Sequence, residues 1–197
     1  MNKNALYGLV MCGGKSSRMG TDKSRIVYQQ KEQQYHVYEM LQIFCEKVFI
    51  SCNAKQGKTI DLAYNFIIDE PEFDNVGPMG GLLSALKKLQ HKNLLVIGCD
   101  YPYLTIDVLE GFVKSIKQTT TAAAFYNEEQ QLYEPLLAYY SSQSLETLLH
   151  PFNENNFSLQ HFLGNIQAEK YTIENHHLLK SVDDKKEMLE VKKQLNK

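Results

Sequence analysis

Short apolar runs alternate with segments of helical periodicity along this chain, and this alternation is the feature that most limits its fold. The apolar runs typical of buried strands are Leu6–Cys12, Val48–Ile50, Phe66–Ile68, Leu94–Ile97 and Ala122–Tyr126. Helical patterns lie between them, near residues 35–44, near residues 81–89 and after Thr105. Strands joined by such helices pair in parallel through right-handed crossovers. We therefore expect an α/β fold, a three-layer α/β/α sandwich around a mostly parallel, doubly wound sheet.

Two segments depart from this rhythm. Tyr133–Tyr140 follows the preceding strand after the turn-like residues Asn127–Gln130, which predicts antiparallel pairing at one edge of the sheet. Asp183–Lys197 is expected to be a packing helix, and its apolar stripe consists of Met188, Leu189, Val191 and Leu195. The 197 residues are predicted to form a single domain, 1–197.

The charge balance excludes several classes of partner. A net charge of -2 and a pI near 6.3 give no overall field that would attract nucleic acid or an acidic membrane. Any phosphate must therefore be bound by a local arrangement of residues. We find neither a signal peptide nor a membrane-spanning segment, so we expect a soluble, cytoplasmic protein.

The cysteines and histidines do not indicate zinc. Cys12, Cys45, Cys52 and Cys99 are too widely spaced for a zinc pair, and we expect them to be reduced and in or near the core. The six histidines include no two-histidine zinc pattern on a predicted helix.

Residues 13–23 follow the first strand directly, at the edge where open α/β sheets bind ligands. Gly13 and Gly14 allow backbone N–H groups to approach phosphate oxygens, while Arg18 offers a planar fork and Lys23 a compact charge. A Walker A loop is excluded because Leu9 stands where that motif needs glycine. The dinucleotide fingerprint also fails, for lack of its third glycine. The pattern favours phosphate binding over a solvated loop whose glycines only serve turns.

Two carboxylates follow other predicted strands. Asp100 comes after Leu94–Ile97 and either binds magnesium or caps the turn before Pro102. Asp69 follows Phe66–Ile68 and either contacts a nucleotide base or forms a turn. Gly80 and Gly81 open a helix, whose unpaired N–H groups would suit a base or a ribose.

The segment Leu9–Lys23 resembles the signature loop of the molybdenum cofactor guanylyltransferases and their nucleotidyltransferase relatives. The resemblance implies a Rossmann-like nucleotidyltransferase fold in which Cys12, Gly13 and Gly14 contact the nucleotide. It also implies that Arg18 and Lys23 neutralise the triphosphate during catalysis. Cys99–Pro102 is similar to the family's Cys-Asp-x-Pro turn, which implies that Asp100 binds both the metal and the nucleotide.

The likeness continues through the base site. Gly77–Gly81 is similar to the family's Gly-Pro-Leu-Ala-Gly turn, which implies that Gly80 lies against the nucleotide, and Asp69 matches the aspartate associated with guanine recognition. Glu134–Tyr140 resembles the family's Pro-x-x-Ala-Leu-Tyr strand. Leu179–Lys185 lacks both asparagines and the proline of the family's late segment, which is tied to the acceptor side.

The activity implied by the resemblance is a Mg²⁺-dependent transfer of GMP from GTP to the phosphate of molybdopterin, with release of pyrophosphate. Two alternatives remain open at this point. One is a transferase directed to CTP or a sugar phosphate, and the other is a non-catalytic nucleotide-binding protein.

Overall fold

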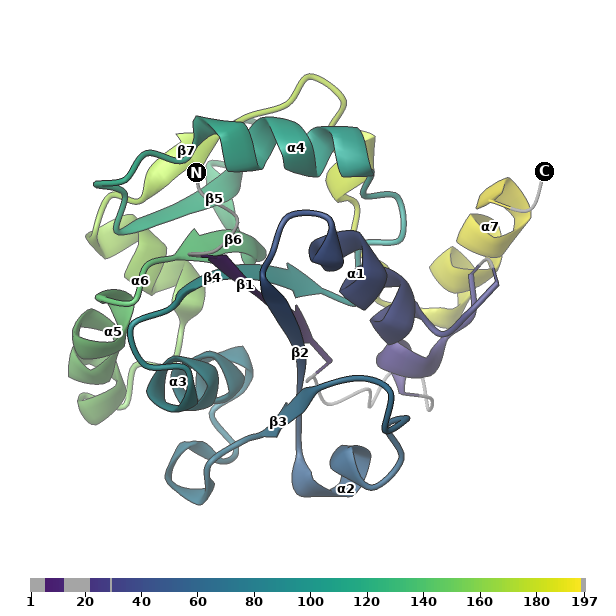
Figure 1. The fold of residues 1–197 in the computed structure, drawn as a ribbon. Helices are drawn as coiled ribbons and strands as arrows, with labels where there is room; N and C mark the ends of the chain where they lie inside the picture. Colours follow the sequence, from purple (N-terminus) through teal and green to yellow (C-terminus); the bar gives the residue numbers. More distant parts are fainter. Residues whose placement is uncertain (1–5, 13–21, 29, 196–197) are drawn as a thin grey trace.

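The computed structural model describes residues 6–12, 22–28 and 30–195. Its centre is one sheet of seven described strands, in the order β3-β2-β1-β4-β6-β5-β7 (Figure 1). The strands are β1 (Leu6–Met11), β2 (Lys47–Cys52), β3 (Phe66–Ile68), β4 (Asn93–Gly98), β5 (Ala122–Asn127), β6 (Leu132–Tyr140) and β7 (Glu169–Tyr171).

The sheet is mostly parallel, as predicted. β1 pairs in parallel with β2 and β4, β2 with β3, and β5 with β7. The predicted antiparallel strand is β6, which pairs with β4 on one side and β5 on the other, so that β5 and β7 lie beyond it. The connection from Asn127 to Leu132 is too short for a crossover, so β6 must return antiparallel to β5.

Helices cover both faces of the sheet, which confirms the three layers (Figure 1). One face packs on α1 (Gln33–Gln42) and α4 (Ile106–Ser115), and the other on α3 (Pro78–Lys88), α5 (Ser144–Asn153) and α6 (Leu159–Asn165). Each face of the sheet has its own hydrophobic core. Successive side chains of β1 point to opposite faces, so Val10 packs in the core under α1 and α4, and Leu9 packs in the core under α3, α5 and α6. The short helix α2 (Ala54–Gly57) follows β2.

The end of the chain returns to the carboxyl edge of the sheet. The helix α7 (Lys185–Leu195) buries Val191 against Ile26, Tyr28 and Val182, so it is the packing helix that was predicted. Its predicted stripe was wrong at Leu189, which is 49% exposed. Three 3-10 helices in the described chain complete the elements, namely Lys23–Arg25, Pro71–Phe73 and His176–Leu179.

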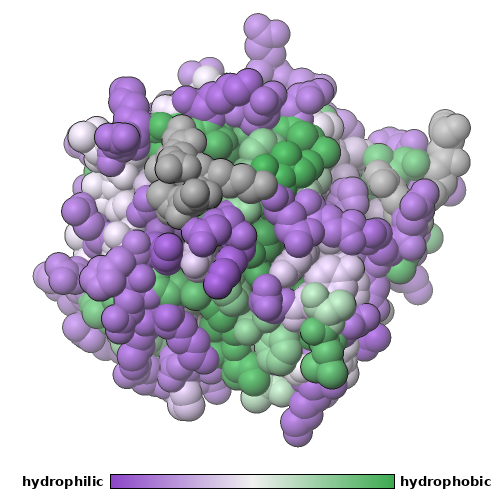
Figure 2. Space-filling view, viewed as in Figure 1, coloured by the Kyte–Doolittle hydropathy of each residue, from purple (hydrophilic) through white to green (hydrophobic). Residues whose placement is uncertain are grey.

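Hydrophilic residues cover most of the face shown in Figure 2, with hydrophobic residues visible between them. Within the described ranges, no helix is both long and apolar enough to cross a bilayer. All four cysteines are free and buried, as the sequence predicted.

Candidate functional site

The ends of β1 and β4 lie side by side at the carboxyl edge of the sheet. Met11 pairs in register with Gly98, and the backbone N–H of Cys99 donates to the Met11 carbonyl at 3.2 Å. The sulfur atoms of Cys12 and Cys99 are 3.4 Å apart. The loop that follows Cys12 and the turn that contains Asp100 therefore begin next to each other, as a shared ligand site requires.

Asp100 is a half-buried carboxylate with an unsatisfied oxygen. Its Oδ1 is fully buried and has no hydrogen-bond partner among the described residues. Burial raises the pKa of Asp100, and its own backbone N–H and the positive charge of Lys23 partly offset this shift. A buried acceptor without a donor is costly in free energy, and a bound cation would satisfy it.

The oxygen chemistry of this edge suits Mg²⁺, which takes one or two carboxylates together with substrate phosphates and water. In the part of the chain that the structure describes, no cluster of three or more His, Cys, Asp or Glu side chains could hold a metal ion. A site completed by phosphate oxygens is compatible with Asp100, whereas a metal cage made of protein side chains alone is not found there.

Lys23 lies at the same edge, held by a residue from the far end of the chain. Its Nζ is 2.7 Å from Oδ1 of Asp183, and the backbone N–H of Val182 donates to the Asp100 carbonyl at 2.8 Å. Asp22 caps the short helix that starts at Lys23 by accepting from the backbone N–H of Ser24. Asp183 therefore lies at the candidate site, where the sequence analysis did not place it.

The missed signal was present in the sequence. Leu179–Lys185 lacks the family's asparagines, but it contains Asp183 and Asp184. Aspartate, like asparagine, offers side-chain oxygen atoms as ligands. The separation of 160 residues between Lys23 and Asp183 is what hid the contact.

Asp69 and the start of α3 form a second part of the edge. The Asp69 carboxylate follows β3, accepts a hydrogen bond from the Ser51 hydroxyl at 3.1 Å, and has a pKa raised by burial. A Cβ on Gly81 would collide with the Ser51 hydroxyl and would lie 3.4 Å from Oδ1 of Asp69. A Cβ on Gly80 would collide with the Phe73 carbonyl, so packing alone explains that glycine. The structure thus brings Asp69 close to Gly81 and places Gly80 against Phe73.

A further carboxylate, Glu134, reaches the edge from β6. The Tyr101 hydroxyl donates to Glu134 Oε2 at 2.8 Å, and burial raises the pKa of Glu134, with the charge of Asp100 adding to the shift. The sequence interpretation used Glu134 only as part of a strand motif. Its place at the site depends on the reversed direction of β6, which no local pattern encodes.

The predicted residues thus fall into two groups. Cys12, Lys23 and Asp100 lie together at the ends of β1 and β4, and Asp69 and Gly80 lie toward β3 and α3. Gly13, Gly14 and Arg18 lie outside the described residues, so their roles remain predictions.

Comparison with known proteins identifies relatives across most of the chain. The model of the MobA-like NTP transferase domain matches residues 8–168. A molybdenum cofactor biosynthesis bifunctional protein from Synechocystis is 35% identical over 147 residues, which are 74% of this chain and 42% of that protein. The chain thus spans less than half the length of that relative. A molybdenum cofactor guanylyltransferase from Haemophilus influenzae is 27% identical, over 92% of this chain and 96% of its own.

Solved structures share the fold. A molybdopterin-guanine dinucleotide biosynthesis protein A from Archaeoglobus fulgidus superposes with a TM-score of 0.79 at 20% identity, covering 96% of this chain and 98% of its own. A CMP:2-keto-3-deoxy-manno-octonic acid synthetase complexed with CTP superposes with a TM-score of 0.68 at 12% identity, covering 99% of both chains. At these identities the likeness establishes the fold alone.

The fold and the adjoining strand ends, together with these relatives, define a nucleotidyltransferase. The chain belongs to the family of MobA-like NTP transferase domains. The resemblance drawn from Leu9–Lys23 is thereby confirmed.

Proposed function

We propose that this enzyme transfers GMP from GTP to the phosphate of a molybdopterin-type acceptor and releases pyrophosphate. The observation that supports this most strongly is the position of Asp100, whose unsatisfied oxygen lies at a strand end adjoining the start of residues 13–23. The relatives, which include molybdenum cofactor guanylyltransferases, support the choice of nucleotide and acceptor.

The nucleotide is proposed to lie along the edge from β3 to β4. Asp69 would accept hydrogen bonds from the base, because a carboxylate can pair with both N1–H and the exocyclic amine of guanine. The N-terminal turn of α3 at Gly80 and Gly81 would offer N–H groups beside it. Cys12, Gly13, Gly14, Arg18 and Lys23 would follow the triphosphate.

Asp100 would hold Mg²⁺, with Asp183 as a second carboxylate close to the same edge. When bound, the cation would offset the negative charge of the phosphates. Lys23 is held by Asp183 in a partly exposed ion pair, with side chains 25% and 61% exposed. Such pairs contribute at most about 1 kcal/mol, so Lys23 can exchange Asp183 for a phosphate at small cost.

The chemistry requires no protein nucleophile. An oxygen of the acceptor phosphate attacks the α-phosphorus of GTP in line, the new P–O bond forms, and the bond to pyrophosphate breaks. An acceptor that is already an anion needs no strong base to activate it. The residues contribute by positioning the reactants and by stabilising negative charge, which Lys23 and Arg18 would do directly.

The two alternative functions are a transferase with other substrates and a nucleotide-binding protein without catalytic activity. A CTP-directed or sugar-phosphate-directed transferase would use the same loop and the same metal ligand, and the CTP-bound fold neighbour shows that this fold serves such substrates elsewhere. A non-catalytic nucleotide sensor is disfavoured, because the chain belongs to a family of transferases.

A nucleotide panel tests the proposal. The purified protein is incubated with the molybdopterin acceptor, Mg²⁺ and GTP, CTP, ATP or UTP in turn, and pyrophosphate release is measured. We expect GTP to support the fastest release and the acceptor to be guanylylated. Faster pyrophosphate release with CTP than with GTP would contradict the proposal, as would pyrophosphate release that does not depend on the acceptor.

A further inference from the structure

Three cysteines lie at the carboxyl ends of three adjacent strands, β2, β1 and β4 (Figure 1). They are Cys52, Cys12 and Cys99, and their side chains pack in the core that α1 and α4 cover. The reaction proposed above uses no thiol. We propose that Cys12 and Cys99 are a modification site, where a small-molecule disulfide oxidises them to a reversible disulfide bond that disables the candidate nucleotide site. The effect on transfer rests on the proposed function, whereas the bond itself does not.

The pairing of β1 with β4 brings the two thiols together. Met11 lies opposite Gly98 in the parallel register, so Cys12 and Cys99 are the next pair along these strands. Adjacent strands are about 4.8 Å apart, which lies within the Cα separation of about 4.4–6.8 Å that a disulfide spans. The two sulfur atoms are 3.4 Å apart. Side-chain rotation and a small shift of the strand ends would therefore bring them to the bonding distance of about 2.05 Å.

Cys52 provides an internal comparison, because it is the neighbour of Cys12 on the other side. Met11 also pairs with Ser51, so Cys12 and Cys52 occupy the next register position of β1 and β2. The Cys52 thiol, however, donates to the Ile67 carbonyl of β3 at 3.6 Å. Strand spacing alone would allow Cys12 either partner. The orientation of the thiols selects Cys99.

The bond would link the two segments whose arrangement the candidate site needs. In the sequence, Cys12 immediately precedes residues 13–23 and Cys99 immediately precedes Asp100. A Cβ on Gly98 would collide with Oδ1 of Asp100, so this carboxylate lies directly against the end of β4. A shift of the Cys99 backbone therefore moves the Asp100 carboxylate. A misplacement of about 1 Å can lower a catalysed rate roughly a hundredfold.

The oxidation is a thiol–disulfide exchange in two steps. The thiolate of one cysteine attacks the small-molecule disulfide and releases one small thiol, and the thiolate of the other cysteine then attacks the mixed disulfide and releases the second. The two protein thiols lose two electrons and two protons, which the small-molecule disulfide gains. Cys12 is 7% exposed and Cys99 is 4% exposed, so the exchange requires local opening and should take minutes to hours.

The packing around Cys12 favours the reduced form once the oxidant is gone. The Cys12 thiol donates to Gln34 Oε1 at 3.7 Å, and Gln34 is 4% exposed. A disulfide would take this donor away from a buried amide oxygen, which costs free energy. Reduction by an added thiol restores the contact. The bond is therefore expected to respond to the balance of small thiols and disulfides, as transient protein disulfides do.

Peptide mapping tests the bond. The folded protein is incubated with 2-hydroxyethyl disulfide, the reagent is removed, and the remaining thiols are blocked with N-ethylmaleimide in denaturant before trypsin digestion. The four cysteines fall in four tryptic peptides, and we expect one crosslink, between residues 4–15 and residues 93–114. Peptides 32–47 and 48–55, which contain Cys45 and Cys52, should carry the blocking group. A bond between Cys12 and Cys52, or no protein disulfide, would overturn the inference.

Transfer of GMP tests the effect of the bond. Wild-type protein whose intact mass shows the loss of two hydrogens and no added reagent should transfer GMP roughly a hundredfold more slowly than the same sample after dithiothreitol. Cys52→Ala is the matched control and should form the bond and lose activity as wild type does. Cys99→Ala should form no protein disulfide. Thermal unfolding checks that both variants fold. Crosslinked wild type that keeps the rate of the reduced protein would overturn the inference.

Two measurements without acceptor separate this inference from the proposed function. If reduced wild type transfers no GMP, the proposed function fails, while the peptide map still decides whether the bond forms. The effect of the bond is then measured as the rise in Tm that GTP and Mg²⁺ cause. We expect this rise in the reduced protein and a smaller rise in the crosslinked protein. Equal rises in the two forms would overturn the inference.

Discussion

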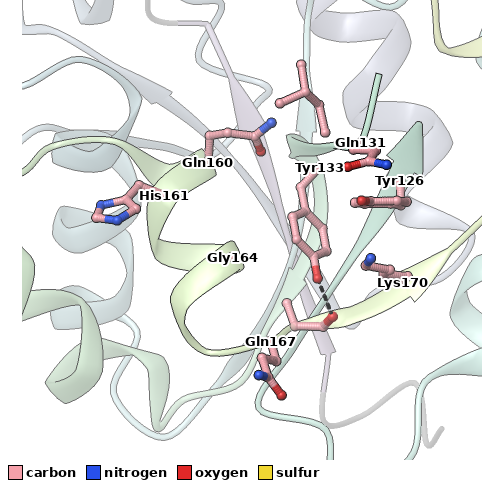
Figure 3. Close-up of a pocket in the computed structure, with 10 residues that line it drawn as sticks. Tyr126, Gln131, Tyr133, Gln160, His161, Gly164, Gln167 and Lys170 are labelled. Carbon is pink, nitrogen blue, oxygen red and sulfur yellow. Dashed lines mark hydrogen bonds between the residues drawn. The ribbon is translucent and has the colours of Figure 1, made fainter. Parts of the chain in front are cut away.

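The two ends of the carboxyl edge differ in what they offer a ligand. The donor side, defined by Asp69, Gly81, Lys23 and Asp100, presents carboxylates and a cation around backbone N–H groups. At the other end, a pocket of about 810 Å³ between β5, β6, α6 and β7, here the β5–β6 pocket, presents aromatic rings and amides around Lys170 (Figure 3). The first set suits a base, phosphates and a metal ion, whereas the second consists of rings and amides around a single lysine. The charged groups that the proposed reaction needs therefore lie on the donor side.

The largest effect is expected from Lys23→Ala. Removing a cation that faces the developing charge should lower kcat roughly a hundredfold to a thousandfold, while thermal stability changes little because the pair with Asp183 is partly exposed. Steady-state transfer kinetics measure this effect. Lys87→Ala, which breaks a surface pair with Glu72, is the control and should keep wild-type rates. If Lys23→Ala kept the kcat of wild type, Lys23 would have no catalytic role.

Asp69→Asn tests whether the donor side selects the base. The substitution removes a charged acceptor for two guanine N–H groups. The KM for GTP should therefore rise about tenfold to a hundredfold, and the preference for GTP over ATP should decrease. Asp74→Asn is a matched control, because Asp74 is an exposed carboxylate close enough to influence the charge of Asp69. Equal KM changes in the two variants would mean that Asp69 acts only through the local field.

The pH dependence should come from the donor side. Burial raises the pKa of Asp100, so its protonation competes with a cation at higher pH than for an exposed aspartate. The Mg²⁺ concentration for half-maximal rate should rise severalfold as pH falls through the raised pKa of Asp100. In stability the sign is opposite. Folding disfavours the ionised form, so the free energy of unfolding of wild type falls relative to that of Asp100→Asn as pH rises from the ordinary pKa of an aspartate to the raised pKa of Asp100.

Those two curves are measured by Mg²⁺ titration of activity and by denaturant unfolding over a pH series. A half-maximal Mg²⁺ concentration that stayed flat across the series would argue against Asp100 as the metal ligand.

The smallest effect is expected at the other end of the edge. The buried Tyr133 hydroxyl donates to the Ala168 carbonyl at 2.8 Å, linking β6 to the start of β7. Tyr133→Phe should lower the free energy of unfolding by about 0.5–1.5 kcal/mol and leave the KM for GTP unchanged. Tyr103→Phe, which loses an exposed bond to Gln194, is the control and should cost less. A changed KM for GTP in Tyr133→Phe would show that the two ends of the edge do not act independently.

The donor side was largely predictable from sequence because its residues follow strands with strong local signals. Leu6–Cys12 and Leu94–Ile97 are apolar runs bounded by glycine, and adjacent parallel strands bring Cys12 and Asp100 to one edge. Asp69 follows a strand that the pattern also marks, and it was predicted for the same reason.

The β5–β6 pocket could not be predicted in this way. The pocket forms only because β6 lies between β4 and β5 in the sheet. Its Tyr126 and Lys170 come from β5 and β7, and the sequence pattern of β7 is weak. β7 has three residues, α6 has seven, and α5 contains Pro151, so none of them shows a long periodic pattern. Tertiary pairing, rather than local propensity, determines this end of the sheet.

The central claim is that the loop after β1 and the carboxylate after β4 share one nucleotide and its cation. Thermal unfolding with GTP, with and without Mg²⁺, tests it directly in wild type and Asp100→Asn. We predict that Mg²⁺ adds to the GTP-induced rise in Tm of wild type and adds nothing in Asp100→Asn, whose ligand-free Tm at neutral pH is at least as high. An equal Mg²⁺-dependent rise in both proteins would contradict it.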